Sequence, residues 1–224
     1  MSKRNKISAI IPARKGSERV KNKNTKNFAG KSLLEIKIAQ LLRVDCFDEI
    51  IISTDCNYAK KIANSFGDKI TVHERESYYC TSQVPINEVY SHLSSICKFD
   101  HVAYIHLTSP LLKDESLVKT VEEYNLVKDP YDSVATVSEL RHYIWYENKA
   151  VNYDPSKHPR SQDLPNYYCL NFAVNVLPKN VMKEKRNIVG NNFLPIYLSE
   201  IESVDVDTPL EFNFAEMCYE NLHG

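Results

Sequence analysis

Short apolar runs alternate along the chain with segments in which apolar residues recur every three or four positions. The runs are typical of buried β-strands and the periodic segments of amphipathic helices. The predicted strands are Ile7–Pro12, Glu49–Ser53, Ile70–His73, His101–Leu107, Ser133–Leu140, Ala173–Leu177 and Pro195–Leu198. The predicted helices are Leu33–Leu42, Asn57–Phe66, Pro85–Ile96, Glu115–Leu126 and Pro209–Asn221. This order predicts a layered α/β fold, in which helices flank a mainly parallel sheet and residues 1–224 form a single domain.

The alternation breaks between Arg141 and Cys169. This stretch is rich in Tyr, His, Pro and Asn, contains Trp145, Tyr146 and Tyr153, and shows no helical periodicity. We interpret residues 141–169 as a hairpin or arm that leaves the sheet. Its aromatic side chains suit either a surface for a partner or a local aromatic cluster, because Tyr and Trp serve both purposes.

The loop after the first predicted strand carries five basic side chains before Asn24. They are Arg14, Lys15, Arg19, Lys21 and Lys23. At the carboxyl end of a first strand, such side chains and the backbone N–H groups around Gly16 can converge on a polyphosphate. The two common glycine-rich phosphate motifs are absent. A basic loop is also typical of ordinary solvated surface, so composition alone leaves both interpretations open.

Two acidic residues, Asp205 and Asp207, precede the last predicted helix. In an extended segment they project from the same side, about 6 to 7 Å apart at their Cα atoms. Paired carboxylates at this spacing suit a hard cation such as Mg²⁺, with Mn²⁺ as a second candidate. The alternative is that Asp207 or Thr208 caps the helix that begins at Pro209.

Two weaker signals come from other loops. Thr108 and Ser109 follow a predicted strand, where hydroxyl groups can bond a base or ribose edge, although Thr-Ser-Pro is also a common turn. Arg160 lies in a polar turn of the arm and could fork onto a carboxylate or phosphate, although a surface arginine is the simpler interpretation.

Composition excludes several classes of protein. The 224 residues are 43% hydrophobic and 25% charged, as in ordinary globular proteins, and the net charge of −1 argues against a general nucleic-acid surface. No apolar run reaches the length of a membrane span, and the N-terminal apolar stretch is too short for a signal peptide, so we expect a cytoplasmic protein. Six scattered cysteines indicate free, mostly buried thiols.

Five segments, in this order, resemble the motifs of the acylneuraminate cytidylyltransferase family. They are Ala13–Asn24 with Gly30–Leu34, Ile51–Asp55, Thr108–Leu111, Arg160–Pro165 and Asp205–Thr208. The resemblance covers nearly the whole chain. It implies a Rossmann-like core whose arm swaps across a homodimer, and transfer of CMP from CTP to a hydroxyl of an acidic keto-sugar, such as sialic, legionaminic or pseudaminic acid, with release of pyrophosphate.

The resemblance also implies roles for individual residues. Arg14 and Lys23 match residues that hold the triphosphate, and together with Asp207, the candidate proton acceptor, they form the expected catalytic group. The expected nucleotide contacts are Ala13, Arg14, Ser17, Lys23, Asn24, His106 and Ser109. The expected acceptor contacts are Arg160, Gln162 and Asn171. The expected Mg²⁺ ligands are Asp205 and Asp207.

Several positions depart from the family pattern. His106 stands where the family usually has Gln, Leu112 where it has Arg, and Phe172 where it has Gly. These changes affect the acceptor more than the CTP chemistry. Two further interpretations therefore stay open: a nucleotidyltransferase that uses a different base or acceptor, and a catalytically silent relative that binds nucleotide.

Overall fold

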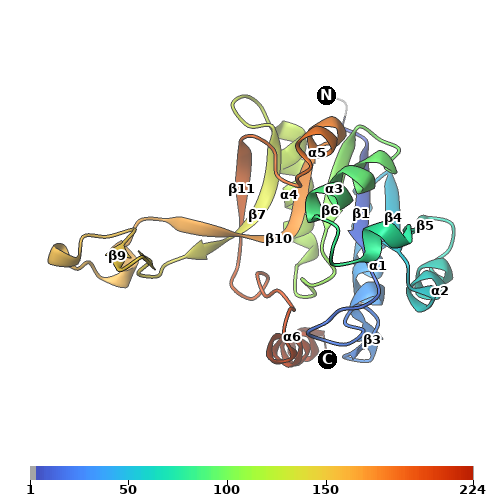
Figure 1. Cartoon of the computed structure of the whole chain (residues 1–224), viewed down its shortest axis with the longest axis horizontal. Helices are drawn as coiled ribbons and strands as arrows, with labels where there is room; N and C mark the ends of the chain where they lie inside the picture. Colours follow the sequence, from blue (N-terminus) through green and yellow to red (C-terminus); the bar gives the residue numbers. More distant parts are fainter. Residues whose placement is uncertain (1–3, 224) are drawn as a thin grey trace.

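The computed structural model describes residues 4–223 (Figure 1). A seven-stranded mixed sheet forms the centre of the molecule, in the order β11-β7-β10-β6-β1-β4-β5. Its strands are β1 (Ile7–Pro12), β4 (Glu49–Thr54), β5 (Ile70–Glu74), β6 (His101–Ile105), β7 (Ser133–Leu140), β10 (Tyr167–Pro178) and β11 (Phe193–Leu198). The helices are α1 (Leu33–Val44), α2 (Asn57–Ser65), α3 (Ile86–Ser95), α4 (Asp114–Leu126), α5 (Lys179–Lys185) and α6 (Pro209–His223).

The predicted α/β class is confirmed, and each predicted strand and helix is present, with small differences at several ends and two larger corrections. First, β10 begins at Tyr167 rather than at Ala173 and runs antiparallel to both of its neighbours, β6 and β7. The chain leaves along β7 and returns along β10, and a hairpin connection of this kind makes the two strands antiparallel. Second, α5 was not predicted. It has seven residues and a single buried one, Met182, so it shows no helical periodicity in the sequence.

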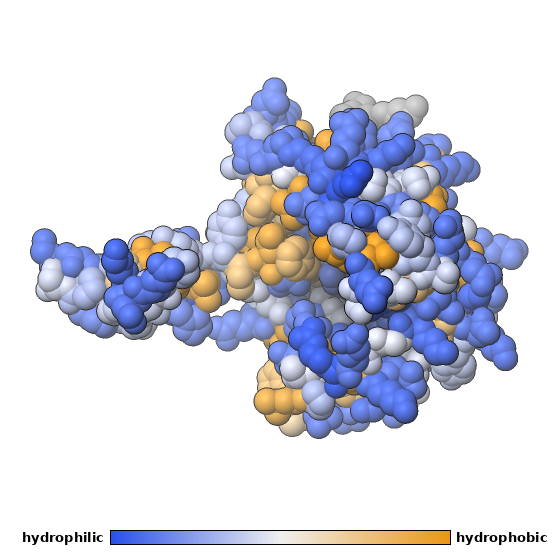
Figure 2. All heavy atoms as spheres, in the orientation of Figure 1, coloured by the Kyte–Doolittle hydropathy of each residue, from blue (hydrophilic) through white to orange (hydrophobic). Residues whose placement is uncertain are grey.

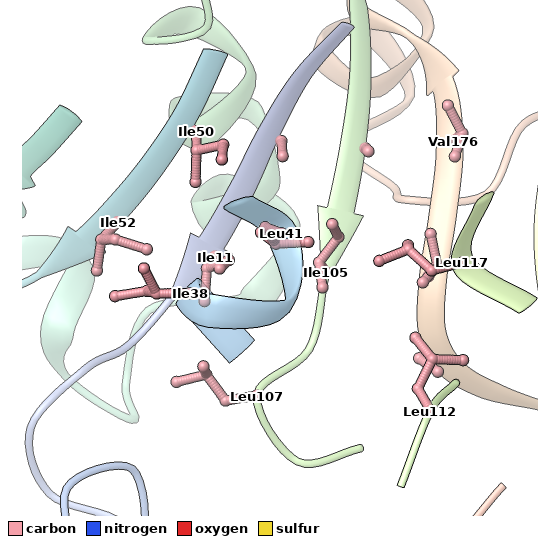
Figure 3. Close-up of a cluster of buried hydrophobic side chains, with 14 of the residues drawn as sticks. Ile11, Ile38, Leu41, Ile50, Ile52, Ile105, Leu107, Leu112, Leu117 and Val176 are labelled. Carbon is pink, nitrogen blue, oxygen red and sulfur yellow. The ribbon is translucent and has the colours of Figure 1, made fainter. Parts of the chain in front are cut away.

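Apolar side chains cover both faces of the sheet. Ile10 and Ile11 are adjacent on β1 and fully buried on opposite faces, which explains why this strand is an unbroken apolar run. The largest cluster lies between the sheet and the helices α1, α2 and α4 and includes Ile11, Ile38 and Leu117 (Figure 3). A second cluster packs against α3 and α5. The layers place the carboxyl ends of β1, β4, β5 and β6 along one edge.

The region 141–169 is an arm, as predicted, and projects from the sheet as a continuation of β7 and β10 (Figure 1). Within the arm the short strands β8 (Trp145–Tyr146) and β9 (Lys149–Ala150) pair. Asn152 ties the arm together, since its side chain accepts from the Ile144 amide (2.8 Å) and donates to the His142 carbonyl (2.8 Å). The space-filling view shows an apolar area where the arm leaves the sheet (Figure 2).

The arm contains a local aromatic cluster and also keeps exposed aromatic surface. Tyr143 and Tyr153 meet edge to face, with ring centroids 5.0 Å apart, and the indole N–H of Trp145 donates to the Tyr153 hydroxyl (2.9 Å). Nevertheless Trp145 remains 53% exposed and Tyr146 68% exposed. Both interpretations of the sequence therefore describe part of the arm.

Two smaller expectations are also settled. All six cysteines are unpaired, as predicted, but only Cys97 is buried, so the expectation of mostly buried thiols is wrong. Among residues 4–223 no helix combines the length and the apolar character needed to cross a membrane.

A short hairpin of β2 (Asn27–Phe28) and β3 (Lys31–Ser32), absent from the predicted elements, leads into α1.

Candidate functional site

A cavity of about 540 Å³ opens at the carboxyl edge of the sheet. Its walls come from the loop after β1, from Arg75 after β5, from the residues after β6, from Phe172 of β10 and from the segment before α6. Seven residues predicted from the sequence line it together: Arg14, Ser17, Lys23, Asn24, His106, Asp205 and Asp207. Open α/β sheets bind their ligands at this edge, so the position of the cavity agrees with the chemistry of its lining.

Hydrogen bonds between separate loops shape the basic loop after β1. The Lys15 amide donates to Asp55 Oδ1 after β4 (2.6 Å). Asn24 Nδ2 donates to the Arg14 carbonyl (3.2 Å), which ties the end of the loop to its beginning. The Arg14 guanidinium reaches across to donate to the Cys80 carbonyl (3.2 Å). These bonds hold the basic side chains on one wall of the cavity.

Asp207 forms ion pairs with two basic side chains. Lys23 Nζ lies 3.0 Å from Asp207 Oδ1 and also donates to the Val206 carbonyl (2.6 Å), while an Arg19 guanidinium nitrogen lies 3.0 Å from Asp207 Oδ2. Burial disfavours the charge on Asp207, but the hydrogen bonds and charges of Lys23 and Arg19 outweigh it and hold the pKa of Asp207 below its ordinary value. Asp207 is therefore ionised at neutral pH.

Asp205 lines the same cavity two residues earlier. The residue between the two acids, Val206, is fully buried in an apolar cluster. Side chains alternate in an extended segment, so both carboxylates point away from this cluster and line the cavity. The Val206 amide donates to the Thr108 carbonyl (2.8 Å), which fixes this segment to the loop after β6. Partial burial and the charge of Asp207 raise the pKa of Asp205, against a hydrogen bond from Thr108 that lowers it.

The helix cap before α6 is provided by Thr208. Its hydroxyl accepts from the Glu211 amide (3.3 Å), and the Glu211 carboxylate accepts from the amides of Asp207 (3.0 Å) and Thr208 (2.7 Å). This reciprocal arrangement is a capping box. Capping therefore involves Thr208 and Glu211 and does not use the side chains of Asp205 and Asp207, which line the cavity.

The two carboxylates fit a cation that is completed by a substrate. Among residues 4–223 no three His, Cys, Asp or Glu side chains come together as a closed metal site. Mg²⁺ does not need one, since it takes one or two carboxylates together with phosphate oxygens and water. Asp205 and Asp207 present oxygen ligands on the same side of one segment, beside a basic wall. This donor set suits Mg²⁺ held jointly with a polyphosphate.

Arg75 is a cavity residue that sequence reasoning missed. Only 4% of it is exposed, and it forms no ion pair with a carboxylate of the described residues. Its Nε donates to Ser53 Oγ (3.1 Å) and an Nη to the Ser53 carbonyl (3.0 Å). A single arginine after a predicted strand carries no distinctive sequence signal. Buried positive charge without a counterion indicates that an anion is to be bound there.

A second cavity of about 400 Å³ adjoins the first and shares Arg14, Arg75, Ile86 and Val89 with it. The loop of residues 81–85, which precedes α3, forms its other wall. The two hollows together make a continuous site with its cationic side chains near the middle. The shape suits an elongated ligand that carries negative charge along part of its length.

His106 lines the cavity, whereas two other predicted contacts lie behind its wall. Burial, with the nearby charge of Lys23, lowers the pKa of His106 to about 4, so its ring is neutral at pH 7. Ala13 is buried and its carbonyl accepts from the Thr54 hydroxyl (2.6 Å). Ser109 is also buried, and its carbonyl accepts from Lys37 Nζ (3.0 Å). Neither Ala13 nor Ser109 lines the cavity.

The three predicted acceptor contacts do not line the cavity of their own chain. Arg160 and Gln162 lie on the arm, where the Arg160 guanidinium pairs with Asp163 (2.7 Å). Asn171 Nδ2 donates instead to the hydroxyls of Ser138 (3.1 Å) and Ser203 (3.3 Å). From this part of the molecule the neighbouring Phe172 lines the cavity.

The α/β sheet carries a cavity with basic and acidic side chains at its carboxyl edge, an arrangement that suits a polyphosphate with a cation. Residues 8–168 match the model of the family described as cytidylyltransferase. The chain therefore belongs to the cytidylyltransferase family, whose members are nucleotidyltransferases.

Full-length relatives support the same family. The chain is 28% identical over 226 residues to CMP-N,N'-diacetyllegionaminic acid synthase of Legionella pneumophila, covering 96% of this chain and 97% of the relative. It is 29% identical over 223 residues to pseudaminic acid cytidylyltransferase of Campylobacter jejuni, covering 96% of each. A solved CMP:2-keto-3-deoxy-manno-octonic acid synthetase in complex with CTP shares the fold, with a TM-score of 0.69 and 13% identity, over 97% of this chain and 99% of that one.

Proposed function

We propose that the protein transfers CMP from CTP to a hydroxyl of an acidic keto-sugar of the nonulosonic acid type and releases pyrophosphate. The observation that carries the proposal is the single cavity in which Arg14, Lys23 and Arg75 face the carboxylates of Asp205 and Asp207. Membership of the cytidylyltransferase family and the two relatives that act on nine-carbon sugar acids support it.

In the proposed reaction the acceptor hydroxyl loses its proton to water, its oxygen forms a bond to the α-phosphorus of CTP, and the bond from that phosphorus to pyrophosphate breaks. Most of the charge lies on the leaving pyrophosphate, so fixed cations stabilise the transition state. Arg14 and Lys23 lie on the loop after β1 and face this charge from one wall, with Ser17 and Asn24 beside them. Arg75, which lines the same cavity, supplies further positive charge.

We assign Asp207 to charge organisation and metal binding rather than to proton removal. Its ion pairs with Lys23 and Arg19 and its lowered pKa make it a weak base. With Asp205 it would hold Mg²⁺, or Mn²⁺ in its place. When bound, such an ion would neutralise phosphate charge and help to orient the leaving group.

We further propose that the active unit is a homodimer in which the arm of one chain completes the site of the other. Arg160 and Gln162 lie on the projecting arm and do not line the cavity of their own chain. The arm also exposes Trp145 and Tyr146, and aromatic residues of this kind are enriched in protein interfaces. A partner's arm would bring Arg160 to an acidic acceptor.

Pyrophosphate release tests the donor and the acceptor together. Each of the four ribonucleoside triphosphates is assayed with Mg²⁺ and a panel of eight- and nine-carbon keto-sugar acids. We expect release from CTP only, and only with an acceptor present. Release with a different triphosphate would identify another nucleotidyltransferase, and binding of CTP without release for any acceptor would identify a silent relative.

The oligomer is tested separately by light scattering on the full chain and on a variant in which residues 143–159 are replaced by a short Gly-Ser linker. The full chain should scatter as a dimer. The variant should be a folded monomer that binds CTP and transfers to no acceptor. A fully active monomer would show that the acceptor site is complete within one chain.

A further inference from the structure

Phe172 lines the cavity in a backbone conformation that bulky side chains rarely adopt. Its φ is +56°, in the left-handed region. It lies where β10 shifts register against β7, between Leu170 and Asn175. Register shifts of this kind re-aim side chains and are frequent beside active sites. Strained backbone persists only where the surrounding structure holds it, and often has a functional reason.

Asn171 holds this bulge in place. Its Oδ1 accepts from the amide of Ala173 (3.2 Å), a bond that spans Phe172. Its Nδ2 donates to Ser138 on β7 and to Ser203 in the segment that leads to Asp205. The Ala173 carbonyl in turn accepts from the His106 amide (3.2 Å). Hydrogen bonds to three separate segments therefore fix the position of Phe172.

The imidazole of His106 lies against Phe172. The two rings are nearly parallel, at 25°, with centroids 6.0 Å apart. His106 Nε2 is buried and has no hydrogen-bond partner among residues 4–223, and His106 lines the cavity. A buried polar atom without a partner is costly unless a ligand or water satisfies it. The pair thus offers an apolar ring face and one unused polar atom.

The order of the strands places this pair at one end of the cavity. Phe172 belongs to β10 and His106 follows the neighbouring strand β6, whereas Arg14 follows β1, the next strand of the sheet, and Arg75 follows β5, its last strand. On the proposed function, on which this inference rests, the nucleotide occupies the side with Arg14 and Arg75. The acceptor then enters on the side of Phe172 and His106.

We propose that Phe172 and His106 determine which sugar acid the enzyme accepts, by favouring a deoxygenated, C–H-rich end group over a polyhydroxylated one. An aromatic face stabilises C–H groups and leaves hydroxyl groups without partners, while His106 Nε2 serves one hydroxyl or amide of the acceptor. Neither side chain carries charge at neutral pH, so the carboxylate of the acceptor is bound elsewhere. Asn171 acts as a positioning residue for Phe172.

The test compares two acceptors, N,N'-diacetyllegionaminic acid, which lacks the terminal hydroxyl, and N-acetylneuraminic acid, which has it. The wild-type enzyme should use the first with the higher kcat/KM. Phe172→Asn and Phe172→Gly both tolerate a positive φ and so keep the bulge. Each should reduce the ratio of kcat/KM for the two acceptors by roughly tenfold, chiefly through KM, as expected for loss of an apolar contact. Thermal melting confirms that each variant is folded.

One control and three further variants sharpen the result. Tyr58→Ala removes an exposed aromatic residue of α2 that lies outside both cavities and should leave the ratio unchanged. His106→Phe should raise KM for both acceptors, and His106→Gln, which can still hydrogen-bond, should restore part of the loss. Asn171→Ala should change the ratio in the same direction as Phe172→Gly.

The outcomes separate this inference from the proposed function. Turnover with both acceptors and an unchanged ratio in the Phe172 variants would overturn the inference alone. A wild-type preference for N-acetylneuraminic acid would also overturn it. Absence of CTP turnover with every sugar acid would overturn the proposed function and this inference with it.

Discussion

The two ends of the cavity are built on different physical principles. At the end near β1, charged groups satisfy one another, since Asp207 pairs with Lys23 and Arg19 within 3.0 Å. At the end near β10, the wall is an aromatic ring on strained backbone beside an imidazole with an unused nitrogen. The first end is organised for a highly charged ligand. The second is organised for the shape of an uncharged group.

The charged end should be the more sensitive to substitution. Asp207→Asn keeps the size of the side chain and removes the charge that holds Lys23, Arg19 and the proposed Mg²⁺. We expect the rate of pyrophosphate release to fall by about 10²–10³-fold, the usual effect of losing a preorganised electrostatic contact. The melting temperature should change little. Excess EDTA should abolish the wild-type activity, and Mg²⁺ or Mn²⁺ should restore it.

The matched control is Asp68→Asn, at an exposed aspartate outside this cavity, which should behave as the wild type does. Normal turnover of Asp207→Asn in a metal-replete assay would remove Asp207 from the catalytic group. It would also show that the two ends of the cavity differ less than their geometry indicates.

The next largest effects are expected for the cationic side chains on the nucleotide side of the cavity. Arg14→Ala, Lys23→Ala and Arg75→Ala should each weaken binding of CTP by roughly tenfold or more, because each removes a charge-assisted contact worth about 1.5–3 kcal/mol. Calorimetric titration with CTP measures this directly. Arg43→Ala, which breaks an exposed ion pair with Asp114, is the control and should bind CTP normally. Unchanged affinity for CTP in all three variants would show that the basic loop is ordinary solvated surface.

Lys37 of α1 donates to the Ser109 carbonyl in the loop after β6 and should make stability depend on pH. It is fully buried, and burial lowers the pKa of its ammonium to about 7, against a smaller opposing effect of Asp114. The unfolded chain keeps an ordinary lysine and so binds more protons than the folded chain between pH 7 and 10. Stability should therefore rise with pH across this window.

Lys37→Met removes this dependence. Relative to the variant, we expect the wild type to gain about 2 kcal/mol of unfolding free energy between pH 7 and pH 9. Urea denaturation at both pH values measures the difference. Parallel pH profiles for the two proteins would show that the Lys37 ammonium is not perturbed by its surroundings.

Thr208→Ala should have the smallest effect and should spare the chemistry. Losing the hydroxyl that caps α6 costs about 1 kcal/mol of stability. Thr208→Ser keeps the cap and serves as the control. Both variants should keep the wild-type affinity for CTP at the charged end. A loss of activity far beyond the loss of stability would show that the cap and the carboxylates are not independent.

The sequence named cavity residues where each lies close to the element that positions it. Arg14 and Lys23 lie in the loop after a strand, and Asp205 and Asp207 precede a helix with a clear start signal. That the four would lie together followed from the resemblance to the family, and their roles stay a prediction. Arg75 could not be found this way, because its burial depends on Ser53, 22 residues earlier. The direction of β10 depends on the arm, and periodicity alone does not report it.

The acceptor contacts were the hardest to predict for the same reason. The motif around Arg160 was identified, but its side chain lies on an arm that extends away from its own cavity. For Phe172 the sequence showed a bulky residue at an unusual position. The positive φ of Phe172 could not be predicted, because it depends on tertiary hydrogen bonds. The same is true of Asn171, whose side chain bonds Ser138 and Ser203 instead of lining the cavity.

The length of β10 couples assembly to selectivity. A single run of 12 residues carries Tyr167 at the root of the arm, Phe172 at the cavity and Val176 in the core. If a second copy binds the arm, a change in the direction of the arm would move Phe172 relative to the packed segment around Val176, because all three belong to one strand. Substitutions far out on the arm would then alter which sugar is accepted, so oligomer design and substrate redesign cannot be pursued separately in this protein.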